Sequence, residues 1–276
     1  MPTVRERLTT FPPARAAYRL RVGLHERAAM RRRPREALRW LARGREMGNF
    51  TYELENVDEM AAVTARVGGA SEDEVRRLFA ELESDDELRA GLRERLRTRP
   101  REREPEPFYG GRFMWYALAR LRRPVAIAEL GIHDGLGTAV LARAVERNAA
   151  EGFPGHVLTF DLSDRAGWLV GPEQAGLVTH HAGDVNETLP RALAERPVEM
   201  SIHDTNQGYD GETFELETVL RYAPGPVTAI SRDARHSGAL RALCERRGLT
   251  YELFQEQPRD HWWPGGEHGL AVIPPG

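Results

Sequence analysis

The 276-residue chain contains no lysine and a single cysteine, and both scarcities exclude whole classes of chemistry. All 39 residues in the combined lysine and arginine count are arginines, a usage better explained by coding bias than by function. Without lysine there is no P-loop lysine, no Schiff base and no lysine-bound pyridoxal phosphate. Cys244 alone cannot form an internal disulfide, a CxxC redox pair or a zinc site of paired thiolates.

Long apolar runs and a secretory leader are also missing. No stretch approaches the roughly 20 apolar residues that span a membrane, and the N-terminal MPTVRER has no apolar segment behind its charges. No GxSxG string offers a serine-hydrolase elbow. With 41% hydrophobic and 29% charged residues, the composition is that of an ordinary globular protein. We expect a cytoplasmic protein without a membrane partner.

The charges are unevenly distributed, although the net charge is only -3. Residues 1–45 carry thirteen arginines against three glutamates, whereas residues 46–107 carry ten arginines against seventeen acids. A basic arm can bind nucleic acid, but this one also has an amphipathic helical pattern and an acidic neighbour. Because aromatic residues are sparse in it, we favour packing within the chain or in a dimer, with a nucleic-acid binder or modifier as the alternative.

The N-terminal part of the chain is predicted to be helical. Ser71-Glu-Asp-Glu is a capping box before apolar residues at helical spacing, and a second helix is predicted over 85–96. Residues 99–107 are charged, proline-rich and non-periodic, which indicates a linker. The sequence thus predicts a helical region over 1–107, serving as a cap or an oligomer contact, and a second domain over 108–276.

Residues 108–276 alternate between short β-rich runs and helical patterns. Helical patterns cover 138–148, 213–221 and 238–246. The alternation predicts an α/β fold, a Rossmann-like seven-stranded and mostly parallel sheet with helices on both faces. Such sheets bind ligands at the carboxyl ends of their strands. The predicted strands lie at 125–130, 157–160, 177–180, 198–202, 227–230, 250–254 and 270–273.

A glycine-rich string, ELGIHDGLGT over residues 129–138, lies between the first predicted strand and a helix. Glycines in such a turn permit positive φ and close approach of a ligand to the backbone, with a helix N-terminus behind them. A dinucleotide fingerprint, GxGxxG, fails at Val140. An acid followed by GxxxGxG resembles motif I of the class I S-adenosylmethionine-dependent methyltransferases.

Three further segments follow in the matching order. Asp161 ends the second strand, where a carboxylate offers two oxygens to a ribose diol. HAGDVNETLP over 181–190 resembles a "GD, then TLP" segment, and IHDTNQGYDGETF over 202–214 stands where relatives have IDGDHxYxxxxxD. Together the four segments are similar to the bacterial small-molecule subgroup of these enzymes, the methyltransferase-24 type.

The resemblance implies S-adenosyl-L-methionine as cofactor and a small-molecule acceptor, preferably a hydroxyl of a natural product or sugar. The short arginine-rich helices and the separate N-terminal region predict a homodimer or a higher homo-oligomer. Nitrogen methylation, another use of the same cofactor and a degenerate binding domain remain alternatives. The cofactor-binding residues that it implies are Glu129, Gly131, His133, Asp134, Gly135, Gly137, Thr138, Asp161, Leu162, Asp184, Val185 and Tyr109.

Methylation of a hydroxyl also requires removal of a proton. The candidate bases are Asp204, His203, His236 and His261. The resemblance further implies a divalent cation such as Mg²⁺ on Asp204 and Asp233, but Asn206, Gln207 and Arg232 replace residues usual in the group. Because hard cations need several oxygen ligands, we favour a reaction without metal.

The aromatic pair Trp262–Trp263 precedes the last predicted strand. It is predicted either to wall an acceptor pocket or to pack at the sheet edge.

Overall fold

The computed structural model describes residues 20, 23–24, 27–31, 34–43, 52–98, 106–205, 208–232, 234–259 and 263–275. These residues fall into two compact units, one within 1–56, 89–110 and 256–265 and one comprising 57–88, 111–255 and 266–276. Residues 57–88 therefore belong to the unit that contains the sheet, although they precede the predicted boundary at residue 107. A cap or oligomer role for the N-terminal region remains a prediction.

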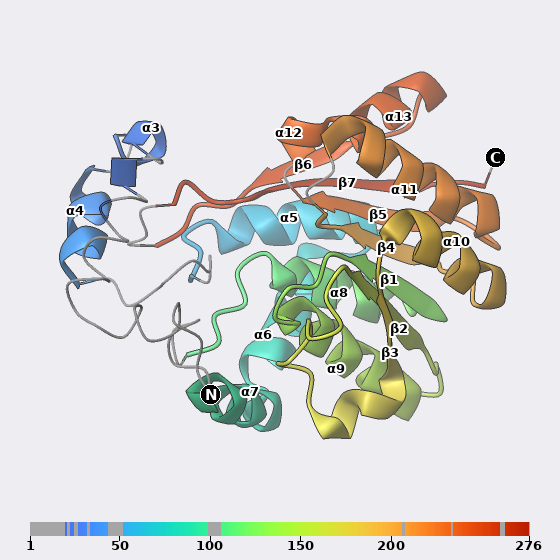
Figure 1. The fold of residues 1–276 in the computed structure, drawn as a ribbon, viewed down its shortest axis with the longest axis horizontal. Helices are drawn as coiled ribbons and strands as arrows, with labels where there is room; N and C mark the ends of the chain where they lie inside the picture. The colour runs from blue at the N-terminus through green and yellow to red at the C-terminus, as the bar shows by residue number, and fades with distance from the viewer. Residues whose placement is uncertain are drawn as a thin grey trace. The chain divides into compact units, whose positions relative to one another are not determined.

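The second unit is built on one seven-stranded sheet of order β3-β2-β1-β4-β5-β7-β6 (Figure 1). Strands β1 to β5 pair in parallel, and β7 is antiparallel to both β5 and β6. All seven predicted strands are present, and the Rossmann-like, mostly parallel sheet is confirmed. The strands are Ala126–Leu130 (β1), His156–Asp161 (β2), Val178–Ala182 (β3), Met200–His203 (β4), Val227–Arg232 (β5), Glu252–Gln255 (β6) and Glu267–Ile273 (β7).

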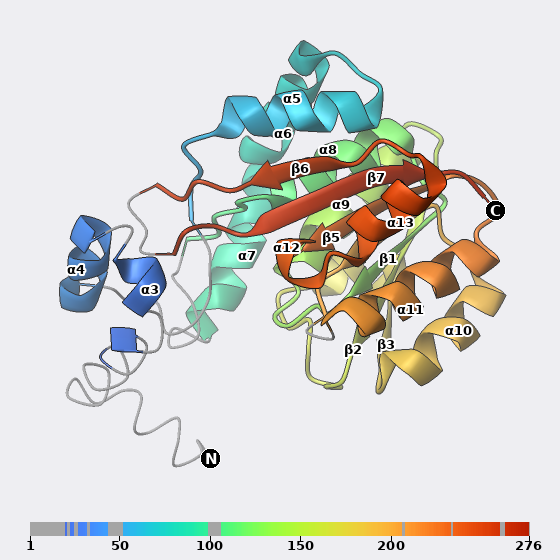
Figure 2. The ribbon, with the colours of Figure 1, turned by 90° about the horizontal axis from the view of Figure 1, so that it is seen from above.

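Helices cover both faces of the sheet, which explains why every residue of β1 is buried. Helices α5, α6, α8 and α9 lie on one face, and α10, α11 and α13 lie on the other (Figures 1 and 2). These helices are Val57–Gly68 (α5), Glu72–Glu83 (α6), Arg112–Arg122 (α8), Leu136–Ala150 (α9), Val185–Glu195 (α10), Gly208–Tyr222 (α11) and Ala239–Arg247 (α13); shorter elements are the 3₁₀ helix Pro172–Leu177 (η1) and Ala234–Ser237 (α12).

The order in which the chain adds strands to the sheet changes direction at β1, which lies between β2 and β4. The chain moves from β1 outward to β3 and then returns to β4, on the other side of β1. In open α/β sheets this reversal leaves a crevice at the carboxyl ends of the strands, where ligands bind. The fold therefore points to the ends of β1, β2, β4 and β5.

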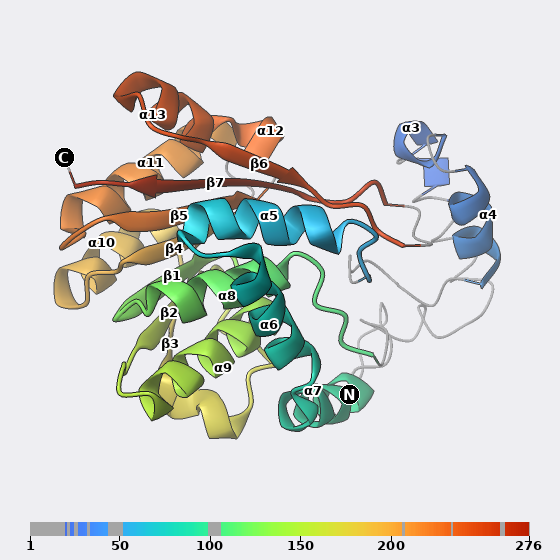
Figure 3. The same ribbon diagram turned by 180° about the vertical axis from the view of Figure 1, so that it is seen from behind.

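Helix α6 begins as its sequence predicts. Ser71 is the N-cap, and its Oγ accepts a hydrogen bond from the amide of Glu74 at 3.2 Å. Val75, Phe79 and Leu82 form the buried stripe of this helix. Figure 3 shows α6 against α8 and α5 alongside β6 and β7.

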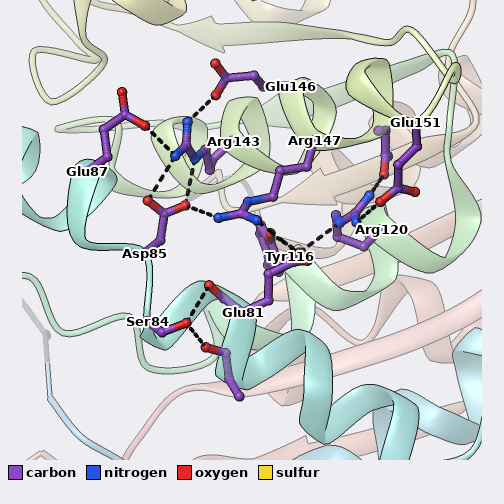
Figure 4. Close-up of polar contacts among 12 residues, drawn as sticks. Glu81, Ser84, Asp85, Glu87, Tyr116, Arg120, Arg143, Glu146, Arg147 and Glu151 are labelled. Atoms are coloured by element: carbon purple, nitrogen blue, oxygen red, sulfur yellow. Dashed lines mark hydrogen bonds and ion pairs between the residues drawn. The ribbon is translucent and has the colours of Figure 1, made fainter.

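Side chains between α6 and α9 form an ion-pair network that centres on the buried Asp85 (Figure 4). Arg143 donates to both oxygens of Asp85, at 2.7 and 3.1 Å, and Arg147 adds a bond at 2.7 Å. On α8, Arg120 pairs with Glu81 at 3.0 Å. The network ties the end of α6 to α8 and α9.

In the first unit, short helices α3 (Arg27–Met30) and α4 (Pro34–Arg43) come from the arginine-rich segment. The helix α7 (Asp86–Thr98) begins in the second unit and continues into the first. Trp263 packs with Met30, Ala37 and Leu41. Trp263 therefore packs against the N-terminal helices, and its predicted place at an acceptor pocket or the sheet edge stays a prediction. Trp262 is outside the described residues.

Within the described residues, no helix has both the length and the apolar character that crossing a bilayer requires.

Candidate functional site

The glycine-rich loop after β1 is shaped by two residues in the left-handed region. Gly131 has φ +81° and Gly135, the N-cap of α9, has φ +85°. A Cβ on Gly131 would lie 2.3 Å from the carbonyl oxygen of Asp204, and one on Gly135 would lie 2.6 Å from the Cα of Gly167. Only glycine satisfies both demands. The loop thus lies directly against the end of β4 and the segment after β2.

His133 occupies a third left-handed position in this loop, with φ +48°. Its side chain is 77% exposed, and its Nδ1 lies 3.7 Å from Oδ2 of the buried Asp134. A left-handed residue other than glycine costs about 1–2 kcal/mol, and such strain concentrates at functional sites. The backbone of the loop is therefore held by its surroundings.

Glu129 is a buried carboxyl near the end of β1. Burial raises its pKa to about 8, although the Thr138 hydroxyl donates a hydrogen bond to its Oε2 at 2.6 Å. A Cβ on Gly137 would lie 2.2 Å from Oε1 of Glu129 and 2.5 Å from the Trp115 ring. Gly137 is therefore required for packing of Glu129 against the first turn of α9.

Asp161, at the end of β2, holds the glycine-rich loop in place. Its Oδ2 accepts the amides of Ile132 and His133 at 3.2 and 3.1 Å, and its Oδ1 accepts the amide of Ser163 at 3.0 Å. The next residue, Leu162, has an apolar side chain that is 81% exposed. A fixed carboxylate beside an exposed apolar side chain suits a ligand with both a polar and a flat apolar part.

Asp184 precedes α10 and caps it. Its Oδ1 accepts the amide of Asn186 at 2.9 Å, and Val185 is buried. A helix cap is the common role of an aspartate at such a position. Contact of Asp184 and Val185 with a cofactor remains a prediction.

Asp204 follows β4 and forms an ion pair with Arg232, the last residue of β5. Arg232 Nη1 donates to Asp204 Oδ2 at 3.0 Å, and the two side chains are 16% and 29% exposed. The Asp204 amide donates to the Leu130 carbonyl at 2.8 Å. A carboxylate and a fixed guanidinium thus stand together beside the glycine-rich loop.

His203 is buried and both of its ring nitrogens have partners within the protein. Nδ1 lies 2.9 Å from Oε2 of Glu215, and Nε2 lies 3.0 Å from Oγ of Ser201. Thr205 donates to the other Glu215 oxygen at 2.6 Å. One buried carboxylate therefore binds the residues on both sides of Asp204, and the geometry favours a positioning role for His203.

Sequence reasoning missed Glu215 and treated Arg232 only as a departure from a pattern. The signal for Glu215 was present, because it stands at the final D of IDGDHxYxxxxxD, one residue beyond the segment compared. The pairing of Arg232 with Asp204 depends on β4 and β5 being neighbours, which no local pattern reports.

The described residues do not fit a Mg²⁺ site. They contain no group of three or more His, Cys, Asp or Glu side chains arranged to hold a metal ion, and the partner of Asp204 is a cation. Because Mg²⁺ prefers octahedral oxygen ligands, this pair does not provide them. The predicted ligand Asp233, together with Asn206 and Gln207, lies outside the described residues.

Three other predicted residues, His236, Tyr109 and His261, stand apart from this cluster in the sequence. His236 is exposed on α12. Tyr109 is buried in the first unit, where the Arg89 guanidinium lies 5.5 Å from its ring centroid. His261 is not among the described residues. Their predicted roles remain predictions.

Comparison with known proteins gives a match over the core of the sheet. The family model described as a methyltransferase domain matches residues 128–230, from β1 to β5. No curated protein matches the sequence.

Solved structures share the fold at low identity. The O-methyltransferase TomG from Streptomyces achromogenes, in complex with SAM, is 17% identical with a TM-score of 0.51, covering 69% of this chain and 91% of its own. A Klebsiella pneumoniae protein assigned as an O-methyltransferase is 18% identical with a TM-score of 0.50, covering 72% and 95%. The Bacillus cereus O-methyltransferase, in complex with SAH, is 17% identical with a TM-score of 0.49, covering 66% and 90%. At these identities the likeness to the first two structures, with TM-scores of 0.51 and 0.50, is one of fold.

Proposed function

Residues 128–230 are a methyltransferase domain of the class I fold, and from this premise we propose that the protein transfers a methyl group from S-adenosylmethionine to a hydroxyl of a small molecule. The observation that carries the proposal is the backbone cradle after β1. Gly131 and Gly135 adopt positive φ there, and Asp161 accepts two loop amides. This loop leads directly into the N-terminus of α9, and helix N-termini after such turns bind anionic groups of ligands.

The residues at this edge of the sheet fit the cofactor by their chemistry. The bound cofactor supplies a methyl group activated on a sulfonium. Its amino acid end would be held near the loop and Glu129, its ribose by Asp161, and its adenine ring by the exposed Leu162. The remaining residues of this unit that we assign to this role are His133, Asp134, Gly137, Thr138, Asp184 and Val185.

For a hydroxyl acceptor, the protein must align the oxygen with the methyl group and remove its proton. Asp204 is our candidate for the base, because its carboxylate is partly exposed beside the glycine-rich loop. Arg232 holds one of its oxygens, while Glu215 holds His203 and Thr205 on either side. His236 and His261 are the other candidate bases.

The proposed acceptor is a hydroxyl of a natural product or sugar. TomG, whose fold this chain shares, is involved in tomaymycin synthesis. A cytoplasmic location and a homodimer also remain proposals, which rest on composition and on the resemblance. The basic arm over residues 1–45 lies largely outside the described residues.

Calorimetry with S-adenosylhomocysteine tests the cofactor assignment. We expect the full-length chain to bind one equivalent, and Asp161→Ala to weaken binding at least tenfold, because a charge-assisted hydrogen bond contributes about 1.5–3 kcal/mol. Asp164→Ala, an exposed aspartate of the same loop, is the matched control and should bind normally. Absence of heat with both S-adenosylmethionine and its demethylated product would refute the proposal.

A further inference from the structure

The ion pair between Asp204 and Arg232 links the carboxyl ends of two neighbouring parallel strands. Arg232 Nη1 and Asp204 Oδ2 are 3.0 Å apart, and both side chains are partly exposed. Arginine stays charged at every pH at which proteins fold. The carboxylate at this site therefore has a permanent cation of the protein's own beside it.

The other carboxylates at this edge also accept hydrogen bonds from the protein. Each of them accepts a hydrogen bond from a group of the loop, of α9 or of the strands. The bonds run to Glu129 from Thr138, to Asp134 from the Leu136 amide, to Asp161 from the amides of Ile132, His133 and Ser163, and to Glu215 from Thr205.

We infer that the Arg232 guanidinium takes the place of a divalent cation beside Asp204, so that methyl transfer in this protein is metal-independent. This inference rests on the proposed function. A divalent cation at Asp204 would have to displace the guanidinium or lie within a few ångströms of its charge. Both arrangements oppose metal binding, because the like charges of the guanidinium and the metal ion repel more strongly at a half-buried site than in bulk water.

The role of the pair follows from the difference between the two cations. A metal ion binds the acceptor oxygen directly and makes its hydroxyl more acidic. A guanidinium donates hydrogen bonds in a fixed plane and does not coordinate the oxygen. Arg232 therefore fixes the orientation of Asp204 and balances its charge. The proton of the acceptor hydroxyl then passes to a protein side chain, for which Asp204 is our candidate.

Titration with Mn²⁺, followed by electron paramagnetic resonance, tests this inference on the full chain saturated with S-adenosylhomocysteine. The proteins are the wild type, D204N, R232D and R232D/D204N. We expect the wild type to have no Mn²⁺ site that depends on Asp204, so that D204N leaves its Mn²⁺ binding unchanged. R232D places a second carboxylate beside Asp204 and should bind Mn²⁺ at least tenfold more tightly, with the gain lost in R232D/D204N.

An exposed arginine on α13 supplies the matched control. R241D makes the same change of charge away from Asp204, so any Mn²⁺ that it binds should be insensitive to D204N. R232N, which offers a neutral oxygen, replaces R232D if circular dichroism shows that R232D is unfolded.

Two results would overturn the inference. One is a wild-type Mn²⁺ site that D204N abolishes, and the other is a folded position-232 variant that gains no Mn²⁺ affinity. Binding of S-adenosylhomocysteine is measured in the same samples, so failure of the proposed function would be seen separately as absence of that binding.

Discussion

Gly135 combines a left-handed backbone, φ +85°, with close approach to the backbone of Gly167. Gly152 has nearly the same φ, +90°, but a Cβ added there would meet nothing within 4 Å. Substitution of Gly152 therefore measures the cost of placing a side chain in the left-handed conformation alone, whereas substitution of Gly135 adds the cost of a steric clash.

We predict that G135A lowers stability and weakens S-adenosylhomocysteine binding at least tenfold, because the added methyl forces the loop away from Gly167. G152A should lose only about 1 kcal/mol of stability, for the left-handed conformation, and bind normally. Urea unfolding and calorimetry measure both. Equal effects of the two substitutions would mean that the contact with Gly167 does not shape the site.

The pKa of Glu129 depends on the surroundings of its carboxyl group in the fold, which the residue type alone does not give. Burial raises the pKa of this carboxyl to about 8, whereas the sequence indicated only an acid in a glycine-rich motif. The sequence did predict the loop glycines, because their spacing is local. It did not predict that Gly137 makes room for Glu129 and Trp115, because that contact depends on α8.

At the scale of elements, the network around Asp85 fastens α6 to α9. Burial alone would raise the pKa of Asp85, but hydrogen bonds from Arg143, Arg147 and the Leu88 amide lower it to about 2 from 3.8. Because the folded-state pKa is depressed, the stabilisation is present above pH 3.8 and is lost as the pH falls towards 2. This shift corresponds to about 2 kcal/mol.

We therefore predict that D85N costs about 2–4 kcal/mol at pH 7, since it also removes the buried anionic partner that Arg143 and Arg147 share. The difference from the wild type should shrink as the pH falls below 4. Urea unfolding between pH 3 and pH 7 measures it. D73N, whose carboxylate is 92% exposed, should stay within about 0.5 kcal/mol of the wild type; a D85N penalty independent of pH would contradict the account.

The strands could be predicted from sequence, because their apolar runs are short, β-branched and bounded by turns. Of the helices on the sheet, α6, α9, α11 and α13 were predicted from their patterns, whereas α8 and α10 were not. The place of α5 and α6 could not be predicted. The amphipathic pattern of α6 indicates a helix with a buried face, but it does not say that this face packs against α8. No pattern in the sequence analysis indicated α5, which lies alongside β6 and β7. Partners distant in sequence, such as Arg232 for Asp204, are visible only once the strand order is known.

At the scale of the whole molecule, the absence of lysine acquires a structural meaning. Arg143 binds both oxygens of Asp85 through Nε and Nη2, a forked geometry that lysine cannot adopt. Arg232 likewise presents a planar cation to Asp204. Coding bias is the better explanation for the composition. The fold nevertheless relies on the arginine side chain at Asp85 and at Asp204.

The central claim is that this chain methylates a small-molecule hydroxyl, and product analysis tests it most directly. The full-length protein is incubated with S-adenosylmethionine, EDTA and a panel of phenolic, natural-product and sugar hydroxyl compounds, and the products are identified by mass spectrometry. We predict an acceptor that gains one methyl group on oxygen, with an equal amount of S-adenosylhomocysteine. Consumption of S-adenosylmethionine without a methylated product, or methyl transfer that EDTA abolishes and Mg²⁺ restores, would contradict the account.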